Sequence, residues 1–558
     1  MFYRTLLLTV IITLVLFSFK IFPVFKLSYE SSELFEKASN IVHARCENKN
    51  IYSEGSLIFT SFDFTVTKKL KGSLNESEGF SIRYLGGSLN GITVRNYDLP
   101  NITQESVYKL FLTDKNDLSF YTILGYNQGI ELISKQPNLK LQKNKKEKLG
   151  KAYSLFTYDC DSEIGVAHWP YSSIPVEIYM DRDALDFDYD DLPLSIHNMF
   201  NQWQSVSTSY FAFEFMGETE NPISYDSISE TGSIDYNSIY LPRMQGTQET
   251  IERHEIIFDK TGDIVYNLFG GDPDSVIGVG YPIIDDSTCE IIDAFLILNM
   301  KNPPVIGILE AAIAHELGHF IGVGHTTVTD TLLADIILPT LFYSVFPEDD
   351  SLGKTIEADD KAAVTALYPA NNVEDYFGAI EGYVQDADGL GIFGISVIAV
   401  NTLTSEAVGS ISGHNDGEDT SDGKFTIYGV LPGTYNIIAQ AINGEEEISD
   451  LRGANLGGIF VDADTSFTAE ILNDISFTYT SGERIAFPEN ALEVTVELGK
   501  TTKGITIIDD ASNEINLTTE AGAFPALSGS EGYTKDTAPS ASVEAEFTYV
   551  APSSGGCG

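Results

Sequence analysis

The sequence contains few cysteines, and this scarcity limits what can hold the fold together. Four cysteines in 558 residues are far too few for a disulfide-rich scaffold. The fold must therefore rest on hydrophobic cores, and because the length exceeds what one core usually organises, several domains are expected. The four are Cys46, Cys160, Cys289 and Cys557.

Basic residues and long apolar runs are also scarce. The chain has 33 Lys and Arg against 81 Asp and Glu, a formal net charge of −48, which argues against nucleic acid or an anionic membrane surface as a partner. This acidity does not indicate wholesale disorder, because 43% of the residues are hydrophobic and 11% are aromatic. After the N-terminus no apolar stretch is long enough for a transmembrane helix, and no internal repeat is evident.

Residues 1–26 have the layout of a secretory signal peptide. Arg4 precedes an apolar run at 6–17, and Lys20 follows it. No small-residue cleavage site follows, so an uncleaved N-terminal anchor is the alternative, although the run is short for a spanning helix. Either reading predicts a protein that is secreted or at the cell surface, with no membrane contact beyond such an anchor.

Changes in composition and in hydrophobic pattern divide the rest of the chain into segments. Alternating runs such as SLIFTSFDFTVTKKL indicate a β-domain, and the basic stretch SKQPNLKLQKNKKEKLGK is typical of a linker. The strand pattern IPVEIYM, followed by an amphipathic helical pattern, opens an α/β domain, after which Gly-containing turns separate further strands. The predicted parts are a signal peptide or anchor (1–26), an N-terminal all-β domain (27–136), a linker (137–158), the α/β domain (159–371), a β-sandwich (376–508) and a low-complexity tail (509–558).

The stretch AHELGHFIGVGH places histidines at fixed offsets inside an apolar run. On a helix, His315 and His319 lie four residues apart, so their imidazoles project from one face. Gly322 lets the helix end and the chain turn, so that His325 can supply a third nitrogen. Three neutral imidazoles plus a water form the open arrangement of a catalytic zinc site. Glu316 can reach that water without being a ligand and can act as the general base.

The alternative interpretation of this stretch is an ordinary helix with structural histidines. For a single histidine, that interpretation would usually be the better one. Five specified residues at these spacings, however, should arise by chance on the order of once in 10⁵ chains of this composition. We therefore predict a metal site, and no residue is predicted to bind any other cofactor.

The pattern H-E-x-x-H-x-x-G-x-x-H resembles that of the metzincins, and Thr326, after the third histidine, is most similar to the Ser or Thr that matrixins carry there. Downstream, IEADDKAAVTALYP resembles the C-terminal helix of matrixin catalytic domains. Upstream, AHWPYSSIPVEIYMD, FNQWQSVS and EIIFDKTGDIV are similar to their first strand, first helix and a later strand and turn. The resemblance covers about residues 160–370.

This resemblance implies a fold and a chemistry. The fold would be multidomain, with an α/β metzincin-like zincin catalytic domain flanked by an N-terminal all-β domain and a C-terminal β-sandwich. His315, His319 and His325 would bind catalytic zinc, and Glu316 would take the proton of the zinc-activated water. The protein would then be a secreted zinc metalloendopeptidase whose substrate is a protein or peptide.

The sequence departs from the family pattern in two places. Metzincins carry a methionine in a turn beneath the zinc, where the stretch DIILPTLFY places Ile337, and an aliphatic side chain of similar volume should keep the shape at modest cost. In mammalian matrixins, a cysteine in a Pro-Arg-Cys-Gly stretch of the pro-segment occupies the zinc and inhibits the enzyme. That stretch is missing here, and Cys46 in VHARCENKN resembles its cysteine only weakly. Asp-rich loops such as DKTGD are candidates for calcium as a second metal.

Two other cysteines lie just before predicted strands of the same domain. In an exported protein, we expect a disulfide between Cys160 and Cys289 rather than two free thiols. This pairing would leave Cys46 and Cys557 outside any intramolecular disulfide.

The segment SDGKFTIYGVLPGTYNIIAQ carries D-G-x-F followed by L-P-G-x-Y, which resembles the signature of the carboxypeptidase regulatory-like β-sandwich. Its Gly and Pro positions suit tight turns, and its two aromatic residues supply core volume, so these residues are expected to hold the fold. The signature residues are Asp422, Gly423, Phe425, Leu431, Pro432, Gly433 and Tyr435.

Two classes of function fit these patterns. The first is a secreted zinc endopeptidase whose flanking β-domains position the enzyme or its substrate. The second is a non-catalytic cell-surface binding or adhesion protein built on a degenerate protease domain. The presence of Glu316 favours the first, because a domain that has lost its chemistry typically loses the base or a ligand.

Overall fold

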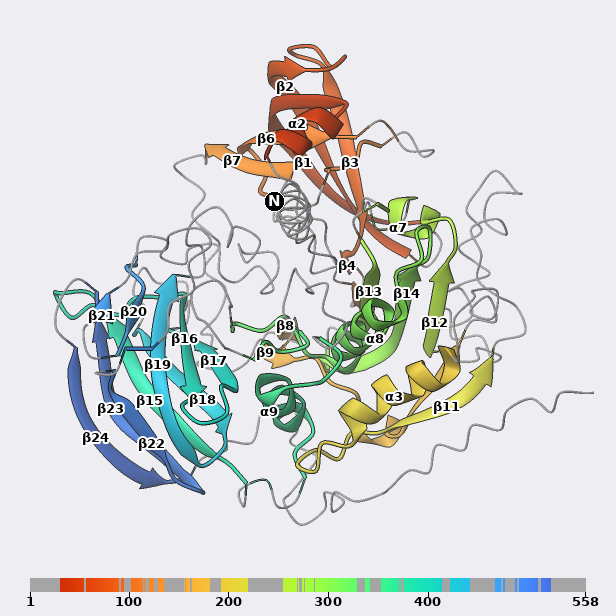
Figure 1. The fold of residues 1–558 in the computed structure, drawn as a ribbon. Coiled ribbons are helices and arrows are strands. Elements are labelled where there is room, and N and C mark those ends of the chain that lie inside the picture. The colour runs from red at the N-terminus through yellow and green to blue at the C-terminus, as the bar shows by residue number, and fades with distance from the viewer. Residues whose placement is uncertain are drawn as a thin grey trace, which may run out of the picture.

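The computed structural model describes residues 31–522 apart from internal gaps, of which the longest are 135–154, 219–253 and 442–466. The predicted signal segment, most of the predicted linker and Cys557 lie outside the described residues. The described strands form five sheets, accompanied by a few helices (Figure 1). None of these helices combines the length and the apolar character needed to cross a bilayer.

The N-terminal region forms a five-stranded antiparallel sheet in the order β3-β2-β1-β6-β7. Alternate residues of β2, among them Phe62 and Phe64, are buried in its core, where Phe64 stacks on Phe80 with ring centroids 5.4 Å apart. The elements of this region are α2 (Ser31–Lys37), β1 (Asn40–Glu54), β2 (Leu57–Lys71), β3 (Gly79–Leu85), β6 (Val107–Leu112) and β7 (Ile130–Ser134).

A seven-stranded mixed sheet has the order β11-β10-β12-β14-β13-β5-β4. The strands from β11 to β14 are parallel, whereas β13 is antiparallel to β14. Beyond β13 the sheet continues with two strands of the N-terminal region, and Thr93 pairs with Ile284 at that junction. The strands are β4 (Gly87–Leu89), β5 (Ile92–Val94), β10 (Val176–Met180), β11 (Phe213–Glu218), β12 (His254–Asp259), β13 (Gly278–Asp285) and β14 (Ile291–Asn299).

Different elements cover the two faces of the mixed sheet. Helices α3 and α8 cover one face, and Nε1 of Trp203 on α3 donates a hydrogen bond to the carbonyl oxygen of Ala314 on α8 at 2.9 Å. Because successive residues of a strand point to opposite faces, Phe295 and Ile297 of β14 lie on the other face, in a core shared with Phe59 of the N-terminal sheet. The helices are α3 (Leu192–Gln204), α7 (Asp263–Asn267), α8 (Ile306–Ile321) and α9 (Ala358–Leu367), and a hairpin of β8 (Thr157–Cys160) and β9 (Glu163–Val166) and a 3-10 helix (Tyr171–Ser173) precede β10.

Two C-terminal sheets share a core in which Phe425 and Tyr435 of the D-G-x-F and L-P-G-x-Y motifs are buried. One sheet has the order β18-β15-β23-β24, and the other has the order β17-β16-β19-β20-β21 with β22 also paired to β19. Strand β24 comes from the range 509–558, for which the sequence predicts a low-complexity tail. The strands are β15 (Gly378–Gln385), β16 (Ile395–Asn401), β17 (Ala407–Ile411), β18 (Lys424–Val430), β19 (Gly433–Ala441), β20 (Glu470–Ile471), β21 (Ile475–Ser476), β22 (Glu493–Val496), β23 (Lys500–Ile508) and β24 (Glu514–Ala521).

These sheets correct the predicted fold class, because the expectation of an α/β metzincin-like catalytic domain is wrong. About half of the described residues (50%) lie in strands and 17% in helices, and the strands are divided among separate sheets. The strand and helix predicted near residues 176–204 are present, but their alternation does not continue into helices on both faces of the sheet. N-terminal strands and the short α7 cover the second face instead.

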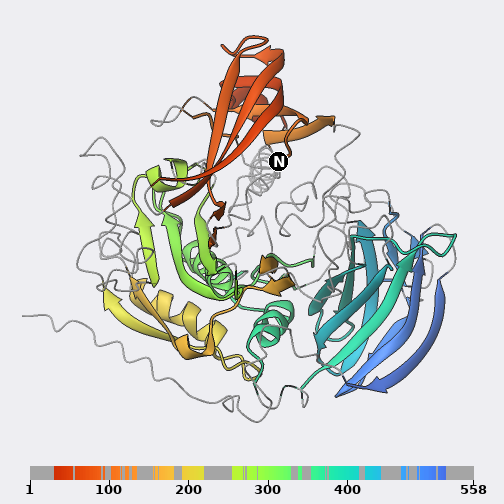
Figure 2. The same cartoon turned by 180° about the vertical axis from the view of Figure 1, so that it is seen from behind.

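The views in Figures 1 and 2 agree on how these parts are arranged. The N-terminal sheet lies above the mixed sheet, and the two C-terminal sheets lie on the opposite side of the molecule from β11. Helix α9 lies between α8 and the C-terminal sheets, and it packs against β17 and β18. The segments around α8 and α9 are therefore placed next to the C-terminal sheets.

Candidate metal centre

Helix α8 carries the histidine motif through the interior of the protein. Every residue from 311 to 321 is buried, which explains why this helix is apolar on all sides. The helix ends at Gly322, whose φ of 108° is a left-handed conformation that favours glycine. A Cβ at this position would also lie 2.7 Å from the carbonyl oxygen of Ala167. The chain turns here and brings His325 back towards the helix.

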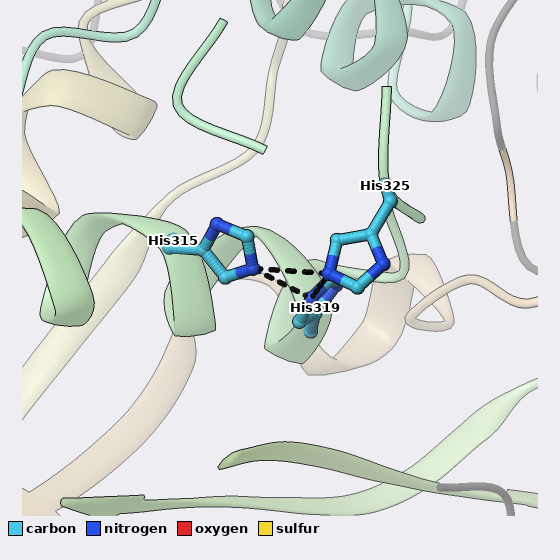
Figure 3. A group of neighbouring side chains, drawn as sticks. All are labelled: His315, His319 and His325. Carbon is cyan, nitrogen blue, oxygen red and sulfur yellow. Dashed lines mark hydrogen bonds between the residues drawn. The ribbon is translucent and has the colours of Figure 1, made fainter. Parts of the chain in front are cut away.

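The structure brings the three histidines together with their rings pointing towards one point (Figure 3). The Nε2 atoms of His315 and His319 are 3.1 Å apart, and each lies 3.2 Å from Nε2 of His325. All three side chains are buried, with between 2% and 8% of each residue exposed. Bonds of 2.0–2.1 Å to one tetrahedral metal would separate such nitrogens by about 3.3 Å, so the spacing fits a metal held by all three.

Hydrogen bonds on the far side of two rings define which nitrogen carries the proton. Nδ1 of His315 is 2.8 Å from the carbonyl oxygen of Thr340, and Nδ1 of His319 is 2.9 Å from that of Val323. A carbonyl oxygen can only accept, so in both neutral rings Nδ1 must donate and Nε2 must present a lone pair. Two lone pairs that face each other at 3.1 Å repel unless a cation lies between them. The donor set therefore fits a metal ion better than it fits a hydrogen-bonded cluster.

Burial also keeps these rings in the form that binds metals. The pKa of His315 is lowered to about 3, mainly by burial and secondly by the neighbouring His319. The pKa of His319 is lowered to about 3 for the same reason, with His325 as the second cause. Both imidazoles are therefore neutral at pH 7 without any metal, and neutral imidazole is the ligand form.

Glu316 lies beside the triad and is held by strand β13. The amide of Gly280 donates a hydrogen bond to Oε2 of Glu316 at 2.5 Å, and only 7% of Glu316 is exposed. A Cβ at Gly278 would lie 2.8 Å from Oε1 of Glu316. Two glycines of β13 thus allow the carboxylate to lie against the strand. Neither glycine was predicted to belong to the site, although glycines inside the strand pattern IGVGYP signal a close approach of other groups.

The segment at 337–341 supports the triad through its backbone. Besides the Thr340 carbonyl that accepts from His315, its amides at Thr340 and Leu341 donate to the carboxylate of Asp360 at 2.7 and 3.1 Å. Asp360 also accepts from the amide of Glu357 in the capping box at the start of α9. Thr340 and Asp360 were not predicted to belong to the site, although the acidic start of IEADDKAAVTALYP indicates a capping role.

Ile337, the residue at the expected methionine position, is tied to the C-terminal sheets. Its amide donates to the carbonyl oxygen of Ser405 at 3.1 Å, and it forms a parallel bridge with Glu406. The described contact between this turn and the histidines is made by Thr340, three residues later.

Cys46 and Cys289 have different environments in the structure. Cys46 is fully buried in the core of the N-terminal sheet, and burial is the main reason why the pKa of its thiol is raised to about 12. The described residues that converge on the metal centre are histidines, and Cys46 is not among them. Cys289 is disulfide-bonded, while the side chain of Cys160, its predicted partner, lies outside the described residues.

The loop DKTGD, considered for calcium, uses its first carboxylate for backbone contacts. The oxygens of Asp259 accept from the amides of Gly262 at 3.0 Å and Val265 at 2.9 Å, at the start of α7. Burial is the main reason why the pKa of Asp259 is raised to about 6. Within the described part of the chain, the group of side chains suited to a metal is the histidine triad.

Comparisons with known proteins add little to this geometry. No protein-family model matches the chain, and no curated protein matches it. A metalloproteinase-II from Bacteroides fragilis has a solved structure that aligns with 61% of this chain and 97% of its own, at 11% identity and a TM-score of 0.19. At that TM-score the likeness does not establish a shared fold, so the interpretation of the site rests on its own geometry.

Proposed function

We propose that this protein is a zinc metalloendopeptidase in which His315, His319 and His325 hold the zinc and Glu316 is the general base. The observation that carries the proposal is the convergence of three buried imidazoles, at least two of which present a lone pair, beside a buried carboxylate. Apolar residues of the same volume would stabilise the core better, so stability alone does not explain this set of side chains. It does have the composition of a catalytic metal site.

Zinc is the metal that best suits this donor set. Three neutral nitrogen ligands at near-tetrahedral spacing leave a fourth position open, as in catalytic zinc sites, whereas calcium and magnesium prefer oxygen ligands. When bound, zinc supplies a Lewis acid that polarises a carbonyl and lowers the pKa of a coordinated water. The hydrogen bonds from Nδ1 of His315 and His319 to carbonyl oxygens orient the rings and strengthen them as ligands.

Glu316 is placed to move the proton. It directly follows His315 on α8, and the Gly280 amide fixes the direction of its Oε2. A carboxylate so oriented can accept a proton from a water next to the triad and return it to the leaving amine. Because Glu316, His315 and His319 all lie on α8, one rigid helix positions the proposed base and two of the proposed ligands.

The finer parts of the proposal rest on the sequence. The peptide substrate follows from the resemblance of residues 160–370 to matrixin catalytic domains, and export follows from the N-terminal segment. The proposed partner is a protein or peptide substrate. Nucleic acid is not proposed as a partner, and membrane contact is proposed only through an N-terminal anchor. The C-terminal sheets would correspond to a carboxypeptidase regulatory-like β-sandwich on the basis of Phe425 and Tyr435.

Two measurements separate this enzyme from the alternative of a non-catalytic adhesion protein. The purified protein would be assayed for bound zinc by mass spectrometry of the metal and for cleavage of a peptide library, with and without a chelator. Stoichiometric zinc and chelator-sensitive cleavage are expected. Zinc without cleavage of any peptide would support the adhesion protein, and absence of zinc would exclude the metal site itself.

A further inference from the structure

The chain that follows His325 leaves the metal centre and enters the C-terminal sheets. Val328 is fully buried, and the carbonyl oxygen of Thr327 accepts a hydrogen bond from Oγ of Ser396 on β16 at 2.8 Å. Val328 belongs to a hydrophobic cluster of the second C-terminal sheet, whose other buried members are Ile398, Val400, Ala407, Ile438 and Ile471. The segment next to the third histidine is therefore part of the core of the C-terminal sheets.

Asp359, in the first turn of α9, joins the same segment to strand β17. Its Oδ2 accepts from Oγ1 of Thr326 at 2.6 Å, and its Oδ1 accepts from the amide of Gly409 at 2.9 Å. The carboxylate is buried, with 3% of the residue exposed. One side chain thus connects the residue directly after His325 with the backbone of a C-terminal strand.

The fit at this junction is tight. A Cβ at Gly409 would lie 2.3 Å from Oγ1 of Thr327 and 3.3 Å from a methyl group of Val328. The turn before Thr340 is attached to the same sheets through the Ile337 amide and the Ser405 carbonyl. The segment that supplies His325 and the turn that supplies the Thr340 carbonyl are therefore both attached to the C-terminal sheets.

His325 needs such support more than the other two histidines do. His315 and His319 are fixed by the backbone of α8, whereas His325 lies beyond the helix, after the left-handed Gly322. If its segment were mobile, metal binding would have to order it, and that loss of conformational entropy would weaken the affinity. A connection that orders the segment beforehand removes this cost.

We propose that the C-terminal sheet containing β16 and β17 is part of the frame of the metal centre, with Thr326, Asp359 and Gly409 as positioning residues for His325. This inference rests on the proposed function only in using the same triad as ligands. It assigns this sheet a role in metal affinity, and it predicts that contacts outside the triad affect the strength of zinc binding.

The test measures zinc affinity without activity. All variants are made in the full chain carrying Glu316→Gln, so that neither turnover nor self-cleavage affects the measurement. The apo proteins are titrated with zinc against a chromophoric chelator, and circular dichroism checks that each is folded. The variants are Thr326→Val, Thr326→Ser and Asp359→Ala, with Ile505→Ala as control, because Ile505 is fully buried on β23 and belongs to a different C-terminal sheet from β17.

Thr326→Val and Asp359→Ala should weaken zinc binding about 10- to 100-fold, the range found when groups that orient metal ligands are removed. Thr326→Ser keeps the hydroxyl and should bind as the parent does, and Ile505→Ala should destabilise the sheets without changing the affinity. Should Asp359→Ala fail to fold, the smaller Thr326→Val change carries the test.

Parent-like affinity in Thr326→Val, or an equal loss in Ile505→Ala, would overturn the inference and leave the proposed function intact. A wild-type chain that binds zinc but cleaves no peptide would refute the proposed function and leave this inference standing. A wild-type chain that binds no zinc would overturn both.

Discussion

The amide of Gly280 donates a hydrogen bond to Oε2 of Glu316 at 2.5 Å, and this contact joins strand β13 to helix α8 at the candidate metal centre. The approach is so close that a Cβ at Gly280 would lie 2.5 Å from the carbonyl oxygen of Glu316 and 2.8 Å from Cβ of His319. A glycine at this position is therefore a condition for placing the proposed base and a proposed ligand at their observed positions.

Gly280→Ala should consequently move α8 away from β13. We expect a loss of about 1–3 kcal/mol in the free energy of unfolding, together with weaker zinc binding, because the helix carries two of the three histidines. Urea unfolding and zinc titration measure the two effects. Gly79→Ala is the matched control, since its Cβ would meet only the carbonyl oxygen of Phe64, at an ordinary 3.8 Å. Equal behaviour of the two variants would contradict this account of Gly280.

Glu316→Gln separates proton transfer from metal binding. Glutamine keeps an oxygen that can accept from the Gly280 amide, so the fold and the zinc content should be retained. Peptide hydrolysis should fall by about 100-fold or more, as expected for the loss of a general base. Zinc analysis and kcat/KM for a fluorogenic peptide provide the readouts.

The control for this change lies on the same helix. Glu310 forms a salt bridge with Lys354 at 3.1 Å and is partly exposed, so Glu310→Gln should leave kcat/KM nearly unchanged. If Glu316→Gln hydrolyses peptides as fast as Glu310→Gln, then Glu316 is not the base.

His319→Ala should abolish both zinc binding and activity, because it removes the ligand whose Nε2 lies within 3.2 Å of both other histidines. Zinc should raise the melting temperature of wild-type apo protein, since a ligand at about 1,000 times its Kd stabilises by about 4 kcal/mol. The variant should show no such rise. His197→Ala, outside the triad on α3, should respond to zinc as wild type does, and a zinc response in His319→Ala would exclude the triad as the binding site.

The triad was predictable because its geometry is local. Spacing of four residues on a helix and a glycine that ends the helix determine most of the arrangement of His315, His319 and His325, and neither depends on distant parts of the chain. The same holds for the cores around Phe64 and Phe425, where alternation predicts strands. In each case the information lies within a short stretch of sequence.

The rest depends on contacts between distant segments. Alternation predicts strands in the N-terminal region, but not that β5 (Ile92–Val94) pairs with β13 as well as with its neighbour β4. This pairing and the apolar face of the N-terminal sheet explain why the predicted α/β fold class is wrong. Likewise, nothing near Asp359 in the sequence indicates that its carboxylate joins Thr326 to Gly409.

Cys46 should be unreactive in the folded protein. Its thiol is fully buried, and burial raises its pKa to about 12, so almost no thiolate exists at pH 8. Iodoacetamide should leave Cys46 unmodified in native buffer and alkylate it fully in guanidinium chloride, as peptide mass spectrometry would show. Rapid native alkylation would place this thiol at the surface and reopen its role as an inhibitory metal ligand.

The N-terminal sheet should stay bound to the mixed sheet after the chain is cut between them. Phe59 and Ile58 of β2 are buried against Val279 and Ile297, and β5 adds a strand to β13, so separation would expose a continuous apolar core. A site for a specific protease inserted in the predicted linker, at 137–158, allows one clean cut.

After this cut, the two fragments should elute together in size-exclusion chromatography in native buffer and separate in urea. Phe59→Ala should weaken their association, because removing a fully buried phenylalanine costs about 3–5 kcal/mol. Phe35→Ala is the control, since 54% of Phe35 is exposed on α2. Fragments that separate in native buffer without any substitution would show that the shared core is too weak to hold the two sheets together.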